Sequence, residues 1–284
     1  MLYNKEWLDT HMCRGDFHSL DAVSKHPGVE AIKDGPNFNG WVDVPTSVKK
    51  HKPDFVFWHN PLTMKNFEHV GVPTVIRYHE MWQRGWTEGE INKTNPSLII
   101  CYHKNDMENY KDLHDKYKFV NISHCIEKTI FKDYGHKKEY DVLFVGVSAA
   151  TIYPLRMRLY NIVKKIPNHK ILEHPGYKLS TEEVNAQIVN YAEEINKAKV
   201  VVSCSSAYKY ALAKYSEIPA CRSFMVADIP GERVDFFRKF IGEIHEDYSD
   251  DKIKDIITFW VNEDEQREKM TDIGYEMTHR DYDS

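Results

Sequence analysis

The stretch DVLFVG at residues 141–146 decides the fold of the second half of the chain. Its apolar run between Asp141 and Gly146 predicts a buried strand, and Pro154 after it is typical of the first turn of a helix. That helix would turn one apolar face toward the strand, formed by Leu155, Leu159, Ile162 and Val163. A strand, a loop and an amphipathic helix in succession make one unit of an α/β sheet.

The same unit repeats in both directions along the chain. Further strands are predicted at residues 54–58, 73–78, 97–102, 119–122, 169–174, 199–204 and 223–227. The segments between them are long enough for helices, and residues 181–183 carry a helix-capping signal. Strands that alternate with helices predict parallel sheets, because parallel neighbours need a crossover connection. The tail from 251 to 278 has the period of two amphipathic helices.

A polar stretch at residues 132–140 interrupts this pattern and separates two halves of similar size. We therefore expect an N-terminal domain of residues 1–134 and a C-terminal domain of residues 135–284, each with its own parallel sheet. The 284 residues suffice for two cores. Ligands of open parallel sheets bind outside the carboxyl ends of the strands, so polar residues that follow strands are the functional candidates.

The composition excludes several classes of protein. The 38 Lys and Arg against 43 Asp and Glu give a net charge of −5 without a basic block, so bulk binding of nucleic acid is not expected. The five cysteines form no CxxC pair, which disfavours a disulfide framework or a zinc site and favours a reducing cytoplasm. Charge comes too early for a signal peptide, and no apolar run is long enough to span a membrane.

The most informative polar stretch covers residues 208–223 and follows the predicted strand at 199–204. It places Lys209, Lys214 and Glu217 on an expected helix, where Lys214 and Glu217 share a face. Cations behind a strand suit a diphosphate, and a carboxylate within one turn can accept hydrogen bonds from sugar hydroxyls. A surface ion pair on a solvated helix explains the same spacing, so the pattern alone leaves both interpretations open.

Five segments carry a family resemblance in the same order and spacing. They are GVPTVIRYHE at 71–80, YDVLFVG at 140–146 continuing to Arg156, KYSEIPAC at 214–221, DIPGE at 228–232, and the stretch from Glu265 to Tyr275. Together they resemble group 1 glycosyltransferases with the GT-B fold, and in particular the spore-maturation-protein-like branch of that family. The resemblance covers most of the chain from residue 70 onward and is poor before it.

The resemblance implies an α/β architecture of the GT-B type, in which two Rossmann-like parallel-sheet domains face a central cleft. The last helix would be able to pack back on the first domain. The C-terminal domain would bind a nucleotide-diphosphate sugar, with Glu217 on the ribose and Lys214 on the diphosphate, and the N-terminal domain would bind the acceptor. The other nucleotide-sugar-binding candidates are Gly146, Ser148, Arg156, His174, Tyr177, Lys209 and Tyr210.

The chain departs from the family at two positions. Lys209 stands where many retaining members carry a second glutamate, and Arg222 replaces the glycine that ends the family motif. The stereochemical outcome therefore stays open. An inverting transferase needs a general base for the acceptor hydroxyl, and Asp16 and His79 rank together as candidates, with Glu80 third.

Three tryptophans follow the strands of the first half and can either stack on a sugar ring or pack in a core: Trp58, Trp82 and Trp86. Asp281 and Asp283 have the spacing of a metal-binding carboxylate pair, but no strand precedes them, and we interpret them as a solvated tail. The halves are small for this fold, so we expect a short first domain whose acceptor site is open or completed by a partner protein.

We therefore expect a cytoplasmic, metal-independent glycosyltransferase that needs no cofactor. It would move a sugar from a nucleotide-diphosphate sugar to a hydroxyl of a glycan, a protein or a modified base. Cations and helix-start amides would stabilise the leaving diphosphate. Two alternatives remain, namely a sugar-nucleotide epimerase of the same fold and a non-catalytic module that binds nucleotide sugars or glycans.

Overall fold

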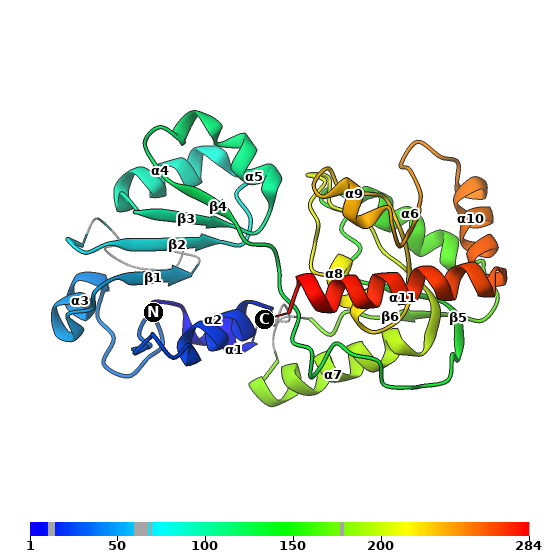
Figure 1. Cartoon of the computed structure of the whole chain (residues 1–284), viewed down its shortest axis with the longest axis horizontal. Helices are drawn as coiled ribbons and strands as arrows, with labels where there is room; N and C mark the ends of the chain where they lie inside the picture. Colours follow the sequence, from blue (N-terminus) through cyan, green and yellow to red (C-terminus); the bar gives the residue numbers. More distant parts are fainter. Residues whose placement is uncertain (11–14, 60–67, 69, 177–178, 284) are drawn as a thin grey trace. The chain divides into compact units, whose positions relative to one another are not determined.

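The computed structural model describes residues 1–10, 15–59, 68, 70–176 and 179–283. The chain divides into two compact units, Met1–Ser123 and His124–Ser284, and each is built on one parallel sheet (Figure 1). Every strand predicted from an apolar run is present.

The first unit contains a four-stranded sheet in the order β1-β2-β3-β4. Its strands are β1 (Val56–His59), β2 (Thr74–Tyr78), β3 (Leu98–Cys101) and β4 (Phe119–Asn121). Its helices are α1 (Lys5–Thr10), α2 (Gly15–Lys25), α3 (Val44–His51), α4 (Arg84–Thr94) and α5 (Lys104–Asn109), followed by a 3₁₀ turn at Lys111–Leu113. Leu2 forms parallel bridges to Trp58 on one side and to Asp34 on the other. The chain therefore runs from Leu2 outward to Asp34 and then returns to β1 on the other side of Leu2, with all three segments parallel.

Apolar side chains cover both faces of this sheet. Alternate residues of a strand point to opposite faces, so Trp58 and Ile76 pack with α4, whereas Phe57 and Ile100 pack with α1 and α2. Strands buried on both faces read as continuous apolar runs, which is the pattern that made them recognisable in the sequence.

The second unit contains a five-stranded parallel sheet in the order β6-β5-β7-β8-β9. Its strands are β5 (Tyr140–Val145), β6 (His169–Leu172), β7 (Ala198–Val202), β8 (Phe224–Ala227) and β9 (Ile241–Glu243). Its helices are α6 (Pro154–Val163), α7 (Thr181–Asn196), α8 (Lys214–Ala220), α9 (Val234–Phe237), α10 (Asp250–Asn262) and α11 (Asp264–Asp281). The strand order reverses between β5 and β7, and ligands of open parallel sheets bind at such a switch point.

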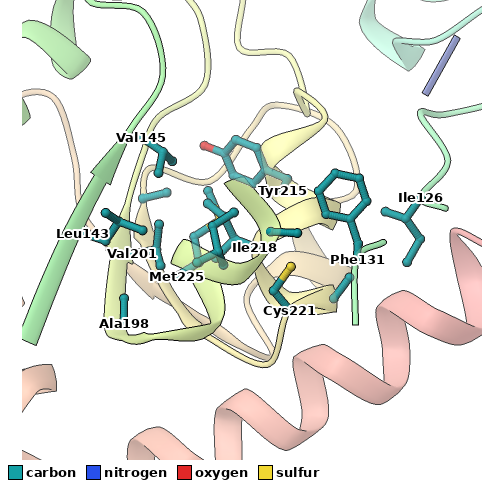
Figure 2. Close-up of a cluster of buried hydrophobic side chains, with 14 of the residues drawn as sticks. Ile126, Phe131, Leu143, Val145, Ala198, Val201, Tyr215, Ile218, Cys221 and Met225 are labelled. Carbon is teal, nitrogen blue, oxygen red and sulfur yellow. The ribbon is translucent and has the colours of Figure 1, made fainter. Parts of the chain in front are cut away.

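Two apolar clusters sandwich the second sheet. On one face Leu143, Val201 and Met225 pack against α7 and α8, as Figure 2 shows for its central residues. On the other face Phe144 and Val202 pack against α6 and α10. The predicted apolar face of α6 is buried here, which confirms the helix expected after Pro154. The capping signal before α7 is confirmed as well, because Ser180 and Glu183 form a reciprocal capping box.

The segment between the two sheets belongs to the second unit. The sequence places the domain boundary after residue 134, but the compact units divide between Ser123 and His124. Ile126 and Phe131 are buried in the cluster that covers α7 and α8, which explains why the polar residues around them do not form a linker.

The C-terminal tail is solvated in part: Asp281 and Asp283 are exposed, as the sequence suggests, but the residue between them is buried. Tyr282 is 5% exposed and belongs to the same apolar cluster, and Asp283 forms a backbone bridge to Ile126. Tyr282 is therefore part of the second core, and α11 before it packs against α8 and β8. Within the described residues, none of the helices has both the length and the apolar character needed to cross a membrane.

A fragment of residues 124–284 should melt at a higher temperature than a fragment of residues 135–284. The shorter fragment loses Ile126 and Phe131 from the core, and removing one buried aromatic side chain alone costs about 3–5 kcal/mol of the free energy of unfolding. Thermal unfolding followed by circular dichroism measures the difference, with Phe131→Ala in the full chain as the control. Equal melting temperatures would support the boundary at residue 134.

Candidate functional site

The guanidinium of Arg156 lies at the switch point of the second sheet. Its Nη1 donates to the carbonyl of Val147 in the loop after β5 at 3.1 Å, and its Nη2 donates to the carbonyl of Cys204 after β7 at 3.0 Å. The side chain is 2% exposed, and its Cζ lies 3.8 Å from the ring centre of Tyr153. Arg156 therefore links the two loops between which a ligand of this sheet would bind.

Gly146 ends β5 directly beside two cations. Its φ of +104° lies in a region that L side chains rarely adopt, and a Cβ added there would lie 2.8 Å from Lys214 Cε and 3.1 Å from Arg156 Nη1. A side chain at this position would therefore strain the backbone and make the ends of the Lys214 and Arg156 side chains shift. The structure brings Gly146, Arg156 and Lys214 together, as predicted.

Glu217 lies one turn after Lys214 on α8 and is 7% exposed. Its Oε2 accepts a hydrogen bond of 3.0 Å from the hydroxyl of Tyr191 on α7. Burial raises the pKa of Glu217, although Lys214 and the Tyr191 hydroxyl act in the opposite direction. We call Gly146, Arg156, Tyr191, Lys214 and Glu217 the switch-point cluster.

His174 follows β6 and borders this cluster. Its Nδ1 accepts a hydrogen bond of 3.0 Å from the backbone of Gly176, and burial together with nearby Lys214 lowers its pKa. The imidazole is therefore neutral at pH 7 and carries its proton on Nε2. Ser148 is half-buried in the loop after β5. Tyr177, the remaining candidate of this loop region, lies outside the described residues.

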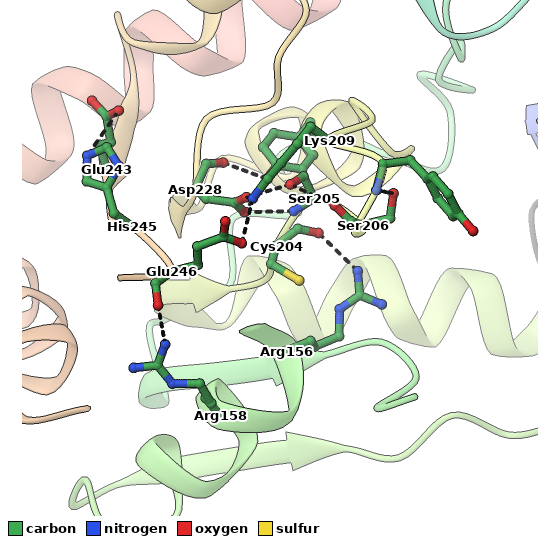
Figure 3. Close-up of polar contacts among 12 residues, drawn as sticks. Arg156, Arg158, Cys204, Ser205, Ser206, Lys209, Asp228, Glu243, His245 and Glu246 are labelled. Carbon is green, nitrogen blue, oxygen red and sulfur yellow. Dashed lines mark hydrogen bonds and ion pairs between the residues drawn. The ribbon is translucent and has the colours of Figure 1, made fainter. Parts of the chain in front are cut away.

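Lys209 and Tyr210 have surroundings different from those expected. Lys209 precedes α8, has a φ of +56°, and directs its Nζ to Glu246 at 2.9 Å and to Asp228 at 3.4 Å (Figure 3). Its carboxylate partners are on the loops after β8 and β9, and the helix predicted for it begins only at Lys214. Tyr210 is 1% exposed and stacks with Tyr208, so its ring is a packing element.

The carboxylates around Lys209 line a pocket of about 580 Å³ at the ends of β8 and β9. Asp228 forms its inner wall, where its Oδ1 accepts from the backbone of Ser205 at 2.8 Å and its backbone carbonyl accepts from Tyr215 at 2.6 Å. The DIPGE segment thus fixes the loop that precedes α8, since Glu232 also accepts from the backbone of Ala211 at 2.7 Å.

In the first unit, Asp16 is the centre of a buried polar group. It begins α2, is fully buried, and its Oδ2 lies 3.3 Å from His79 Nδ1 and 3.6 Å from His59 Nε2. Its Oδ1 accepts from the hydroxyl of Tyr102 and lies 3.8 Å from Arg77 Nη2. These five residues, which we call the aspartate-histidine cluster, meet where β1, β2 and β3 end.

The charges of this cluster are set by its geometry. Burial would raise the pKa of Asp16, but His59 and His79 hold it well below its usual range. Burial also disfavours a charged His79, yet Asp16 raises its pKa, with a smaller contribution from Glu80. For His59, burial lowers the pKa, and Arg77 Nε donates to its Nδ1 at 3.2 Å. The two histidines on one carboxylate are thus different bases.

The three candidates for a general base differ in access. Asp16 is fully buried and cannot contact a substrate, so it acts only through its neighbours. The His79 side chain is 25% exposed, and Asp16 at its Nδ1 leaves Nε2 as the nitrogen that can take a proton from outside. Glu80 is half-buried and accepts from Trp82 Nε1 at 3.0 Å.

The tryptophans of the first unit separate into two kinds. Trp58 is 1% exposed and packs in the core, whereas Trp82 and Trp86 are 39% and 62% exposed. Their indole N–H groups donate to Glu80 and Glu90, both at 3.0 Å, which fixes the orientation of the rings.

Four residues of these clusters are not among the residues that the sequence predicts for a site. His59, Arg77 and Tyr102 are at or just after predicted strands, so the rule that polar residues follow strands was able to find them. Tyr191 lies within α7 rather than after a strand, and only the fold brings it to Glu217.

No protein-family model matches this sequence, and a search of curated proteins finds no similar one. Solved structures are similar in fold. Anabaena HepE in complex with UDP-glucose has a TM-score of 0.63 and 11% identity, over 99% of this chain and 94% of HepE. Sucrose-phosphate synthase from Thermosynechococcus elongatus has a TM-score of 0.61 and 12% identity, over 84% of this chain and 72% of that one.

An alpha-glucosyltransferase in complex with UDP-glucose and DNA containing an abasic site is also similar, with a TM-score of 0.57 and 10% identity. This match covers 90% of this chain and 83% of the other. The two parallel-sheet units and these likenesses confirm the predicted GT-B fold.

Replacing Asp16 by Asn should lower the pKa of His79. The substitution removes the carboxylate that raises this pKa and leaves the burial that opposes it. Titration of the imidazole resonances by NMR measures both histidines, and the wild-type His79 should titrate above 6.5 and His59 below it. An unchanged midpoint for His79 in the variant would mean that Asp16 does not govern its charge.

Proposed function

We propose that this protein is a glycosyltransferase that moves a sugar from a nucleotide-diphosphate sugar to a hydroxyl acceptor. The observation that carries the proposal is the switch-point cluster, because a lysine, a nearly buried glutamate and a glycine of positive φ meet at the edge of the sheet where ligands bind in open parallel sheets. Structures similar in fold were solved with UDP-glucose. UDP is therefore the first nucleotide to test.

The donor would occupy the second unit. We assign the diphosphate to Lys214, whose ammonium supplies a positive charge beside Gly146, and the ribose hydroxyls to the Glu217 carboxylate. Arg156 would act by holding the loops, since two of its N–H groups donate to carbonyls. Lys209, which two carboxylates bind, has no assigned phosphate contact in this proposal.

The base would come from the first unit. His79 Nε2 takes the proton of the acceptor hydroxyl. The hydroxyl oxygen then forms a bond to the anomeric carbon of the donor sugar, and the bond from that carbon to the diphosphate oxygen breaks. The electron pair leaves with the diphosphate, whose growing charge Lys214 stabilises. Asp16 holds the imidazole and stabilises the imidazolium that forms. A direct displacement of this kind inverts the anomeric centre.

The acceptor is proposed to be a glycan, although a protein or a modified base has the same hydroxyl chemistry. The exposed rings of Trp82 and Trp86 support a sugar, because aromatic faces stack on the apolar faces of sugar rings. We also propose that the protein is cytoplasmic, that transfer needs no metal, and that a partner protein completes the acceptor site.

Lys214→Ala and Glu217→Gln should each weaken UDP binding by about tenfold or more, since each removes a charged hydrogen-bond partner of the nucleotide. Isothermal titration calorimetry in the presence of EDTA measures the affinity and at the same time tests whether binding needs a metal. Lys209→Ala is the matched lysine control and should bind UDP like the wild type.

If no nucleoside diphosphate in a panel binds the wild-type protein, the donor site is wrong. If EDTA alone abolishes binding, the metal-independent form of the proposal is wrong. Equal losses in the Lys209 and Lys214 variants would contradict the assignment of the diphosphate to Lys214.

His79→Gln should abolish sugar transfer while UDP binding stays unchanged. In the wild type, activity should fall as the pH drops through the raised pKa of His79, because the base must be neutral to accept a proton. The measurement is release of UDP from a nucleotide sugar that stabilises the protein thermally, with a set of saccharide acceptors present.

Glu80→Gln is the control for this prediction and should retain transfer. Loss of transfer in the Glu80 variant but not in the His79 variant would move the base to Glu80. Conversion of the donor to its epimer without an acceptor would indicate the epimerase alternative.

A further inference from the structure

Tyr191 lies beside both Lys214, to which the proposed function assigns the diphosphate, and Glu217, to which it assigns the ribose. Its hydroxyl donates to Glu217 Oε2 at 3.0 Å, and its ring centre lies 5.8 Å from Lys214 Nζ. The ring itself is held edge-on against Phe131 with centroids 6.3 Å apart. Tyr191 is thus anchored in the apolar cluster at one end and directed at the carboxylate and the ammonium at the other.

We propose that Tyr191 is the positioning residue for ribose recognition, fixing the Glu217 carboxylate in the orientation that accepts hydrogen bonds from the ribose hydroxyls of a nucleoside diphosphate. This inference rests on the proposed function, because it concerns the same donor site. Glu217 is 7% exposed, and the hydrogen bond from Tyr191 to its Oε2 holds the carboxylate in one orientation, in which Oε1 would accept from the ligand.

The hydroxyl also acts on the charge of Glu217. Burial raises the pKa of this carboxyl, and the two groups that oppose burial are Lys214 and the Tyr191 hydroxyl. The pKa of Tyr191 itself is raised well above its usual value by burial and by Glu217, so the hydroxyl stays protonated and remains a donor at neutral pH. Without this donor, Glu217 would protonate at a higher pH. One of its two oxygens would then carry a proton and would donate a hydrogen bond instead of accepting one.

The other titratable and charged groups around the pair come from three elements. Cys221 at the end of α8 interacts with both Glu217 and Tyr191, and burial raises its pKa well above the usual range. Arg156 of α6 lowers the pKa of Tyr191, against the effect of burial. His174 after β6 is linked to the pair through Lys214, whose charge lowers the pKa of the imidazole. All three are present in wild type and variant alike, so their titrations cancel when the two proteins are compared.

The test compares wild type and Tyr191→Phe in calorimetric titrations with two probes, UDP and inorganic pyrophosphate. The variant keeps the ring beside Lys214 and loses only the hydroxyl. We expect UDP affinity to fall by about tenfold and pyrophosphate affinity to stay unchanged, because pyrophosphate has no ribose. Tyr160→Phe, on α6 and packed in the cluster on the opposite face of the sheet, is the matched control and should bind both probes like the wild type.

A second readout is the pH profile of UDP affinity. In the wild type, affinity should be lost as the pH falls through the pKa of Glu217, and in Tyr191→Phe the loss should occur at a higher pH. Unchanged UDP affinity and profile in the variant would overturn the inference, as would equal losses for UDP and pyrophosphate. If the wild type binds no nucleoside diphosphate, the proposed function itself falls, which is a different result from wild-type binding that Tyr191→Phe leaves intact.

Discussion

The buried guanidinium of Arg156 is the interaction on which the ligand-binding edge of the second unit depends. Val147 and Cys204 lie in the loops that follow β5 and β7, and this one side chain donates to the carbonyl of each. A buried cation is costly unless hydrogen bonds and a polarisable neighbour compensate it, and two carbonyls and the Tyr153 ring do so here. The loops after β5 and β7 are thus tied to one buried group at the edge where ligands of open parallel sheets bind.

The aspartate-histidine cluster and the switch-point cluster each contain a carboxylate that is buried or nearly so, but the pKa of the two carboxylates shifts in opposite directions. Asp16 has two imidazoles, a guanidinium and a phenol around it, and it stays ionised. Glu217 has one ammonium and one phenol, and its pKa rises. The first is suited to holding a proton on a neighbouring ring, and the second to accepting hydrogen bonds from a neutral ligand. Burial alone does not determine either role, since the number of donors around the carboxylate does.

The strands and most helices could be predicted because a strand buried on both faces leaves a continuous apolar run. The exceptions have physical causes. β9 has three residues with a glycine at its centre and is too short to give an apolar run. Lys209 is expected on a helix, but its positive φ is incompatible with one, and α8 begins only at Lys214. Glu217 and Lys214 were found by helical spacing, which is local. The contact of Tyr191 with Glu217 joins residues that are 26 positions apart, and no local pattern encodes it.

The close approach at Gly146 also limits how this protein can be altered by design. Any side chain there would strain the backbone and displace the ends of Lys214 and Arg156, so the position favours glycine strongly. A library that aims to change the nucleotide accepted by this sheet should leave residue 146 constant. The half-buried His174, which accepts a hydrogen bond from the backbone of Gly176 in its own loop, is the better place for variation.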